Sequence, residues 1–240
     1  GFTGEQIARE VQNMGLRTDF IHINSGFSRI NVKLKDYDGT EINGMGPAIE
    51  PNYVEALHEK LKQLKSGDLL VLAGSIPKSL PAAIYSEILM RLQNRGILFV
   101  VDATKELLLD ALQYKPFLIK PNNHELGELF HVTLDTREAV VAYAKKLQEK
   151  GAGNVLVSLA GQGAVLVDET GTVHMLAAPR GKLVNAVGAG DSMVAGFLAG
   201  WLEKKDYEHA FRMGVAAGSA SAFSALLATG TEIEQVYASL

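Results

Sequence analysis

The chain has 240 residues, of which 47% are hydrophobic and 21% charged, with a formal net charge of −4. This composition is typical of a soluble globular domain and excludes a disordered or fibrous chain, while the lack of cysteine excludes disulfides and thiolate metal sites. The slight acidic excess carries no footprint for nucleic acid, and no apolar run reaches about 18 residues, so we expect a cytoplasmic protein without nucleic-acid or membrane partners.

The first predicted element is a helix that begins almost at the first residue. Thr3 is a candidate N-cap with Gln6 three positions later, and apolar side chains recur on one face at Ile7, Val11 and Met14. The segment "FSRINVKLKDYDGTEINGMG" then predicts two antiparallel strands joined at an Asp38-Gly39 turn. This hairpin, roughly residues 20–46, stands outside the pattern that follows, and we interpret it as a small β lid.

The first strand of the hairpin has one basic face. Side chains alternate along a strand, so one face carries Arg29, Asn31, Lys33 and Lys35. Such a face suits an anionic substrate, because Arg29 is able to bind a phosphate through two hydrogen bonds. A solvated face of a half-buried strand explains the same pattern, and for the strand taken alone it is the commoner explanation.

From residue 51 onward, predicted helices alternate with apolar strands. The helices are "PNYVEALHEKLKQLKSG", "PAAIYSEILMRLQNRG", and residues 106–112, 123–130 and 136–150. The strands are "DLLVLAGS", "ILFVVDAT", "PFLIKPN" and "NVLVSLAG", and a second hairpin is predicted in "AVLVDETGTVHMLAA". Because unbroken apolar strands are buried on both faces, we expect a doubly wound, mainly parallel sheet flanked by helices, an α/β fold that forms one domain over residues 1–240.

The segment "NAVGAGDSMVAGF" is the first candidate site. Gly188, Ala189 and Gly190 are small enough for their backbone N–H groups to converge on an anion, and the N-terminus of the following helix points to the same place. Asp191 in the first turn is able to accept a proton from a hydroxyl nucleophile, as phosphoryl transfer requires. An aspartate favoured by the helix dipole after a glycine-rich turn explains the segment equally well.

The segment "KPNNHEL" is the second candidate site. Asn122 and Glu125 lie at a strand-to-helix junction, where ligands bind in open α/β sheets, and Asp102 ends the preceding strand. Their oxygens suit Mg²⁺. A helix cap by Asn122 with Glu125 in the first turn is the stronger explanation of this segment in isolation. The turn in "SLAGQGAVLV" either lines a nucleotide or simply joins two strands.

Taken in order, the basic hairpin, "LAGSIP", "VVDAT", "KPNNHE", "SLAGQGA" and "VGAGDSMVAG" resemble the PfkB (ribokinase-like) carbohydrate kinases over essentially the whole chain. The resemblance implies a ribokinase-like fold and an ATP- and Mg²⁺-dependent kinase that converts fructose 1-phosphate to fructose 1,6-bisphosphate. Two alternatives stay open, namely a tagatose-6-phosphate kinase and a catalytically inactive sugar-phosphate-binding module.

The resemblance also implies a role for each candidate residue. Asp191 corresponds to the catalytic base, and the backbone of Gly188, Ala189 and Gly190 to the anion hole. Asn122 and Glu125, joined by Asp102, correspond to the Mg²⁺ site. The substrate phosphate would be bound by Arg29, Lys33 and Asn31, and the nucleotide by Ser158, Ala160, Gly161, Gly163, Gly218 and Ser221. Ala160 stands where relatives usually carry glycine.

Two further expectations follow from the same resemblance. The hairpin matches the family's lid, which often pairs with a second subunit, so we expect a homodimer formed through the lid. The family's N-terminal strand and its "GGKG" substrate loop have no counterpart in the sequence. We therefore expect that the N-terminal part of the domain is missing and that the chain is a portion of a longer protein.

Overall fold

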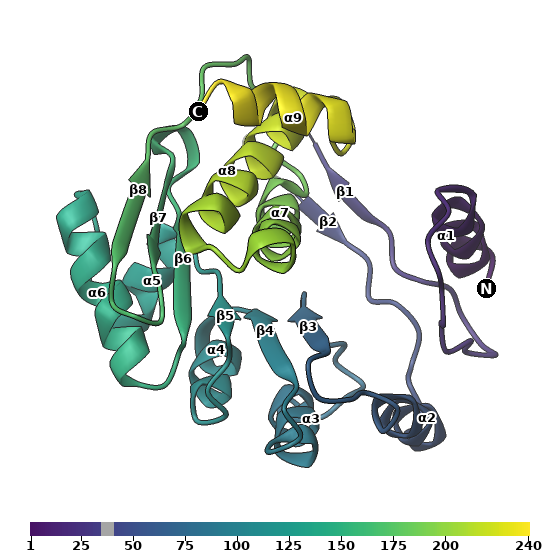
Figure 1. The fold of residues 1–240 in the computed structure, drawn as a ribbon. Coiled ribbons are helices and arrows are strands. Elements are labelled where there is room, and N and C mark those ends of the chain that lie inside the picture. The colour runs from purple at the N-terminus through teal and green to yellow at the C-terminus, as the bar shows by residue number, and fades with distance from the viewer. Residues whose placement is uncertain (35–40) are drawn as a thin grey trace. The chain divides into compact units, whose positions relative to one another are not determined.

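The computed structural model describes residues 1–34 and 41–240 and divides into two compact units (Figure 1). Unit 1 comprises Gly1–Asp68 and Ser75–Ile97, and unit 2 comprises Leu69–Gly74 and Leu98–Leu240. The single domain expected over residues 1–240 stays a prediction. In the described part of the chain, no helix is both long enough and apolar enough to cross a membrane.

Unit 1 holds three helices and one small sheet among its described residues. They are α1 (Phe2–Asn13), α2 (Pro51–Leu61), α3 (Ile84–Leu92), β1 (Asn31–Lys33) and β2 (Glu41–Asn43). Helix α2 begins at a proline because the fixed φ of proline suits the first helical position, where no N–H bond is lost. The guanidinium group of Arg95 donates to the carbonyls of Lys62 and Leu64 at 2.9 and 2.6 Å, which ties the segment after α3 to the segment after α2.

The start of α1 differs from the sequence prediction. Gly1 occupies the N-cap position, and Thr3 already lies inside the helix. The hydroxyl of Thr3 donates to the carbonyl of Ser28 at 2.9 Å instead of capping its own helix. The prediction of Thr3 as N-cap is therefore wrong, because a contact distant in sequence takes the hydroxyl.

The predicted pairing of the first hairpin is confirmed. Strands β1 and β2 are antiparallel, with Asn31, Val32 and Lys33 opposite Asn43, Ile42 and Glu41. The predicted Asp38-Gly39 turn and Lys35 lie outside the described residues. The apolar face of the hairpin is exposed in this unit, with exposed fractions of 53% for Ile30, 42% for Val32 and 59% for Ile42.

Unit 2 is built on a six-stranded mixed sheet with the strands in chain order. They are β3 (Leu69–Ala73), β4 (Leu98–Asp102), β5 (Leu118–Ile119), β6 (Asn154–Ser158), β7 (Ala164–Val167) and β8 (Val173–Leu176). The first four are parallel, and β7 and β8 join them antiparallel. The α/β fold class and the second hairpin are thus confirmed.

Helices cover both faces of this sheet (Figure 1). The helices are α4 (Lys105–Leu112), α5 (Asn123–Phe130), α6 (Arg137–Glu149), α7 (Ala189–Lys204), α8 (Tyr207–Phe223) and α9 (Gly230–Ala238). The fully buried rings of Phe197 on α7 and Phe211 on α8 pack in one cluster with side chains of β4 to β7. Burial of each ring contributes about 1.5–3 kcal/mol to the free energy of unfolding.

Helices α7 and α8 approach each other closely because glycines line their contact. A Cβ atom on Gly196 would lie 2.5 Å from the carbonyl oxygen of Met213, and one on Gly200 would lie 2.9 Å from Cα of Ala210. Each glycine costs about 1 kcal/mol in helix propensity, so its presence marks a place where space decides. The first turn of α7 is consequently held against α8.

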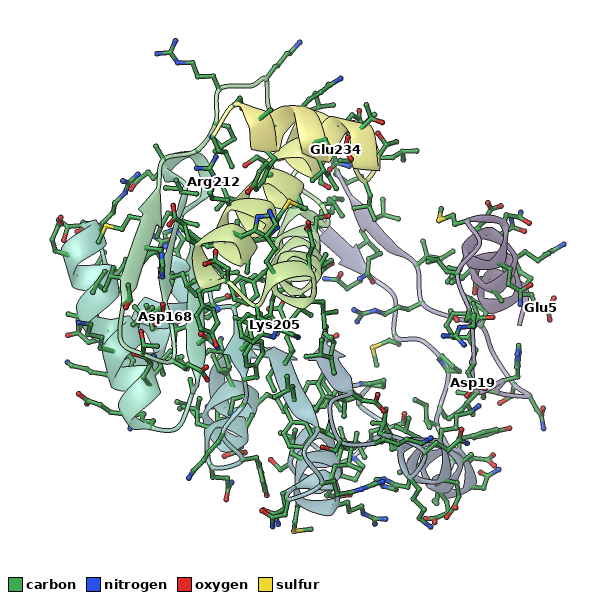
Figure 2. All side chains as sticks on the ribbon, viewed as in Figure 1. Glu5, Asp19, Asp168, Lys205, Arg212 and Glu234 are labelled. Carbon is green, nitrogen blue, oxygen red and sulfur yellow. The ribbon has the colours of Figure 1, made fainter. Side chains whose placement is uncertain are left out.

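Aromatic stacking secures the far end of α7. The ring of Trp201 stacks on Tyr207 with centroids 4.7 Å apart, and Phe117 lies 5.3 Å from the same indole. The ammonium group of Lys205 lies 5.0 Å from the Trp201 ring, and Arg212 on α8 lies 5.2 Å from the ring of Tyr237 (Figure 2). Cation–π contacts of this kind contribute about 0.5–1 kcal/mol where they are exposed.

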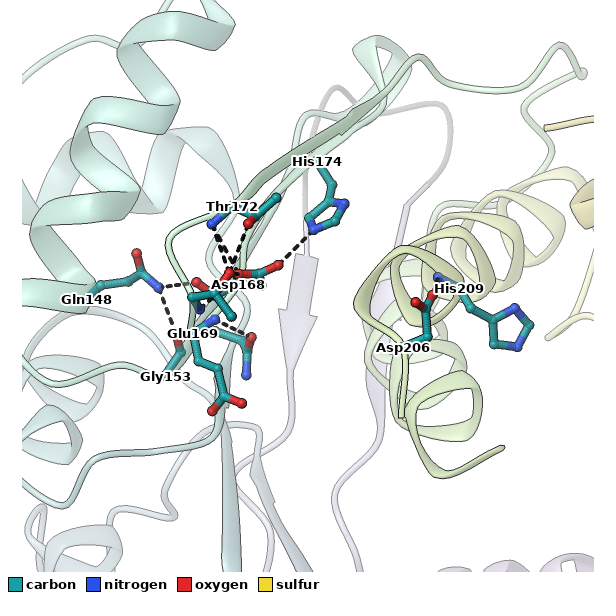
Figure 3. Close-up of polar contacts among 10 residues, drawn as sticks. Gln148, Gly153, Asp168, Glu169, Thr172, His174, Asp206 and His209 are labelled. Carbon is teal, nitrogen blue, oxygen red and sulfur yellow. Dashed lines mark hydrogen bonds and ion pairs between the residues drawn. The ribbon is translucent and has the colours of Figure 1, made fainter. Parts of the chain in front are cut away.

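A polar cluster closes the β7–β8 hairpin (Figure 3). Oδ1 of Asp168 accepts hydrogen bonds from the N–H and hydroxyl of Thr170 and from the N–H of Thr172, and Oδ2 lies 2.8 Å from Nε2 of His174. Burial opposes ionisation of Asp168, but the hydrogen bonds from Thr170, His174 and Thr172 outweigh it and lower the pKa of this carboxyl group. Gln148 of α6 donates to the Asp168 carbonyl at 2.7 Å and so joins the hairpin to that helix.

Candidate functional site

The carboxyl ends of the parallel strands in unit 2 bring three candidate segments together. Asp102 is the last residue of β4, Lys120 directly follows β5, and Ser158 is the last residue of β6. Asn122 pairs with Ser158 in a parallel bridge, and the N–H of Ser158 donates to the carbonyl of Pro121 at 3.2 Å. This edge is where open α/β sheets bind ligands.

Asn122 and Glu125 form a capping box at the start of α5. The N–H of Glu125 donates to Oδ1 of Asn122 and the N–H of Asn122 donates to Oε2 of Glu125, both at 2.8 Å. The helix-cap explanation of this segment is therefore correct as geometry. It leaves Oε1 of Glu125 without a hydrogen-bond partner among the described residues, so the carboxylate retains one oxygen for a ligand.

The N-terminus of α7 presents unpaired backbone donors. Gly188 is the N-cap residue with φ of +79°, a left-handed conformation that glycine adopts without strain. Within the described residues, the N–H groups of Gly190 and Asp191 make no hydrogen bond, whereas the N–H of Ala189 donates to the carbonyl of Ala186 at 3.3 Å. The available donors are thus shifted toward Gly190 and Asp191, and the exposed Asp191 side chain stands beside them.

Asn185 fixes the turn that precedes these donors. Its Oδ1 accepts from the N–H of Val187 at 3.0 Å, and its Nδ2 donates to the carbonyl of Ala225 at 3.2 Å. The backbone of Asn185 also donates to the carbonyl of Ala222. The turn is therefore attached to the C-terminal end of α8 at several points.

Lys120 is a site residue that sequence reasoning missed. Its side chain is buried, and Nζ lies 3.4 Å from Oδ1 of Asp102. A Cβ atom added to Gly190 would lie 3.2 Å from the same Nζ, so the ammonium group sits directly beside the first turn of α7. A side chain larger than glycine at position 190 would press on this ammonium. The signal in the sequence was a lysine at the end of a buried strand, immediately before Pro121.

The charges of the site influence one another. Burial raises the pKa of Asp102 above its ordinary value, the neighbouring Lys120 acts in the opposite direction, and the carboxylates of Asp191 and Glu125 raise it further. Asp102, Glu125 and Asp191 therefore lie within one electrostatic neighbourhood, as the sequence predicted for Asp102.

The donor set of this neighbourhood fits Mg²⁺. Among the described residues, no three His, Asp or Glu side chains are arranged as a cage for a metal ion. Mg²⁺ does not need such a cage, because it is commonly held by one or two carboxylates together with waters and substrate phosphates. Asp102 and Glu125 provide two carboxylates of that kind.

The predicted nucleotide turn follows β6. It forms a short 3₁₀ turn, Ala160–Gln162, in which Ala160 has φ of +47° and Gly163 has φ of +99°. A side chain on Gly163 would overlap the carbonyl of Leu176, whereas Gly161 is surrounded by open space. The guanidinium group of Arg137 donates to the carbonyl of Gln162 at 2.5 Å and ties the turn to α6.

Gly218 and Ser221 on α8 face the first turn of α7. A Cβ atom on Gly218 would lie 3.0 Å from the carbonyl oxygen of Ala189. Ser221 is buried; its hydroxyl donates to the hydroxyl of Ser192 at 2.9 Å and accepts from the N–H of Ala228 at 3.1 Å. Both residues thus pack against the segment that carries Asp191, and direct nucleotide contact by them stays a prediction.

The remaining predicted residues belong to unit 1. Arg29 precedes β1, and Asn31 and Lys33 are its first and last residues. All three are exposed within that unit. Their contact with a substrate phosphate stays a prediction.

Comparison with known proteins places these features in a family context. A family model described as pfkB family carbohydrate kinase matches residues 1–233. The chain is 48% identical over 236 residues to 1-phosphofructokinase of Bacillus subtilis, covering 98% of the chain and 77% of that protein. It is 34% identical to D-tagatose-1-phosphate kinase of Bacillus licheniformis, again over 98% of the chain and 77% of that protein.

The fold has a counterpart among solved structures. The crystal structure of phosphofructokinase-2 from Escherichia coli in complex with substrates and products matches with a TM-score of 0.90 and 29% identity. The match covers 99% of this chain and 79% of that one.

Proposed function

Because the chain belongs to the pfkB family of carbohydrate kinases, we propose that it transfers a phosphoryl group from ATP to fructose 1-phosphate and forms fructose 1,6-bisphosphate. ATP is the phosphoryl donor that this kinase family implies. The choice of acceptor is supported by the 48% identity to a 1-phosphofructokinase over nearly the whole chain.

The observation that carries the proposal is the N-terminus of α7. Unpaired N–H groups of Gly190 and Asp191 and the positive end of a 16-residue helix meet at the point where Asp191 is exposed. In the proposed reaction Asp191 accepts the proton of the 6-hydroxyl group, and the backbone amides donate to the transferred phosphoryl group. Catalysis of this kind depends mainly on positioning and charge stabilisation, which such an arrangement provides.

Asp102 and Glu125 would hold Mg²⁺. When bound, the ion would neutralise charge on the phosphate oxygens. Asn122 orients Glu125 through the capping box, and Lys120 balances part of the carboxylate charge.

Arg29, Asn31 and Lys33 would bind the phosphate already present on the sugar. Their exposure on β1 within unit 1 agrees with this role. The opposite face of the hairpin leaves Val32 and Ile42 exposed, and we propose that a second copy of the chain covers it in a homodimer. Sedimentation of the protein with hairpin variants V32D and I42D tests this, since both are expected to shift the mass to that of a monomer.

One assay tests the proposed function. ADP release by the intact protein is measured with Mg·ATP and, in turn, fructose 1-phosphate, tagatose 1-phosphate, tagatose 6-phosphate, fructose 6-phosphate and fructose. We expect the highest kcat/KM with fructose 1-phosphate. The relative that acts on tagatose 1-phosphate makes this sugar the second candidate acceptor. Ligand-dependent thermal stabilisation without ADP release for any sugar would contradict the kinase and support a sugar-phosphate-binding module.

A further inference from the structure

Lys120 carries a buried positive charge that its surroundings compensate only in part. Lysine is rarely buried unless it is paired, and an ammonium group has three N–H donors. Among the described residues, the one ion pair of Lys120 is the contact of Nζ with Oδ1 of Asp102, at 3.4 Å. This distance is long for a charge-assisted hydrogen bond, which is about 2.7–2.9 Å. The buried ammonium therefore has donors to spare.

The position of the ammonium group indicates what these donors are for. Nζ lies 3.2 Å from the point that a Cβ on Gly190 would occupy, beside the unpaired N–H groups of Gly190 and Asp191. Two independent sources of positive potential, a helix N-terminus and a buried ammonium, thus converge on one place. They meet within the neighbourhood of three carboxylates, where an anion has few other positive groups to contact.

Resting on the proposed function, we propose that Lys120 is a catalytic residue whose ammonium group donates a hydrogen bond to the phosphoryl group in flight, with Asp102 as its positioning residue. The sugar hydroxyl oxygen forms a bond to the γ-phosphorus, and the bond from that phosphorus to the oxygen bridging it to the β-phosphate breaks. The bonding electron pair leaves with ADP, and the hydroxyl proton goes to Asp191. Lys120 stays protonated throughout and neither gives nor takes a proton.

A purely structural role for Lys120 makes a different prediction. If the ammonium group serves only to neutralise buried Asp102, then removal of both charges together restores the site. If it contacts the phosphoryl group, its loss is felt whether or not Asp102 is charged. A double-mutant cycle with K120M, D102N and K120M/D102N separates the two, because methionine keeps the length of the side chain and asparagine its shape.

The expected results are as follows. K120M lowers kcat by about 100-fold, the effect of removing one donor to transition-state charge, and K120M/D102N is lower than D102N by a similar factor. K120M weakens binding of the non-hydrolysable analogue AMP-PNP by about tenfold and binding of ADP by less than about twofold, because only the former carries the contacted phosphate. K145M, which alters an exposed lysine on α6, serves as the matched control and is expected to behave as the wild type.

Each outcome decides. Equal kcat values for K120M/D102N and D102N, or equal loss of ADP and AMP-PNP affinity in K120M, would overturn the proposal. If K120M fails to fold, as thermal melting would show, the double variant carries the test, since it buries no unpaired charge. Absence of turnover in the wild type would refute the proposed kinase function, whereas the comparison of AMP-PNP with ADP would still decide whether Lys120 contacts the terminal phosphate.

Discussion

The backbone N–H of Glu125 donates to the side chain of Asn122, and the backbone N–H of Asn122 donates to the side chain of Glu125. The two residues proposed to serve the metal thus also start helix α5. A variant that disturbs both roles at once tells little about either. The chemistry of the capping box allows them to be separated.

E125Q is expected to impair Mg²⁺ use while leaving α5 intact. Glutamine is able to close a capping box, but it lacks the negative charge. We expect the Mg²⁺ concentration for half-maximal activity to rise about tenfold, with little change in melting temperature. E125A is expected to lose about 1 kcal/mol of stability as well, because the cap is removed. E128Q, an exposed residue of the same helix, is the control; an unchanged Mg²⁺ requirement in E125Q would remove Glu125 from the metal site.

D191N is expected to abolish most turnover and spare nucleotide binding. Asparagine keeps the size of the side chain but cannot accept the hydroxyl proton, and loss of a general base typically lowers kcat by about 10²- to 10⁴-fold. Calorimetric titration with ADP should give an affinity close to that of the wild type, because backbone amides provide the contacts. D110N changes an exposed aspartate of α4 and serves as the control. Wild-type kcat in D191N would refute the assignment of the base.

D168N is expected to change how stability depends on pH. The folded-state pKa of Asp168 lies below its ordinary value of 3.8. The stabilisation by this carboxylate is therefore fully present above about pH 4 and is lost as the pH falls through the lower, folded-state pKa. At pH 7 we expect D168N to lose about 2 kcal/mol, because charge-assisted hydrogen bonds are given up.

Urea unfolding at pH 7 and near pH 3 measures this change. The difference in stability between the wild type and D168N should shrink as the medium becomes more acidic. D135N, an exposed aspartate before α6, is expected to follow the wild type. A constant difference at both pH values would show that the charge of Asp168 is not the cause.

A160G is expected to stabilise the protein slightly. Ala160 has φ of +47°, a conformation that costs an L-residue about 1–2 kcal/mol, and glycine removes this cost while adding less than about 1 kcal/mol of chain entropy. We expect a net gain of about 0.5 kcal/mol in urea unfolding. A142G, in the exposed middle of α6, should instead lose about 1 kcal/mol. A loss in A160G would mean that the methyl group of alanine packs usefully in the turn.

The sequence predicted the helices best where a side chain caps them. The boundaries of α5 and α6 follow Asn122 and Thr136, whose side chains accept hydrogen bonds from the first turn. Thr229 and Glu232 form the same kind of box before α9, and this signal was overlooked. Thr3 misled because its hydroxyl bonds to Ser28, a partner that local pattern does not reveal.

The candidate site was predicted by residue type and position rather than by depth. Asp102, Asn122 and Asp191 lie at strand ends or at helix starts, which a periodic pattern locates. Lys120 was missed because its importance comes from burial beside Gly190, a residue 70 positions later in the chain. Contacts of that range arise only when the sheet and α7 are assembled.

The stacked indole of Trp201 gives the molecule a built-in optical reporter. It belongs to the single tryptophan of the chain and sits on the same helix as Asp191, ten residues and about 15 Å further along the axis. Its fluorescence therefore comes from one known place, with no overlapping emitter of its kind. A change in emission on addition of nucleotide would report directly on the helix whose first turn receives the phosphate, in the unlabelled protein and in real time.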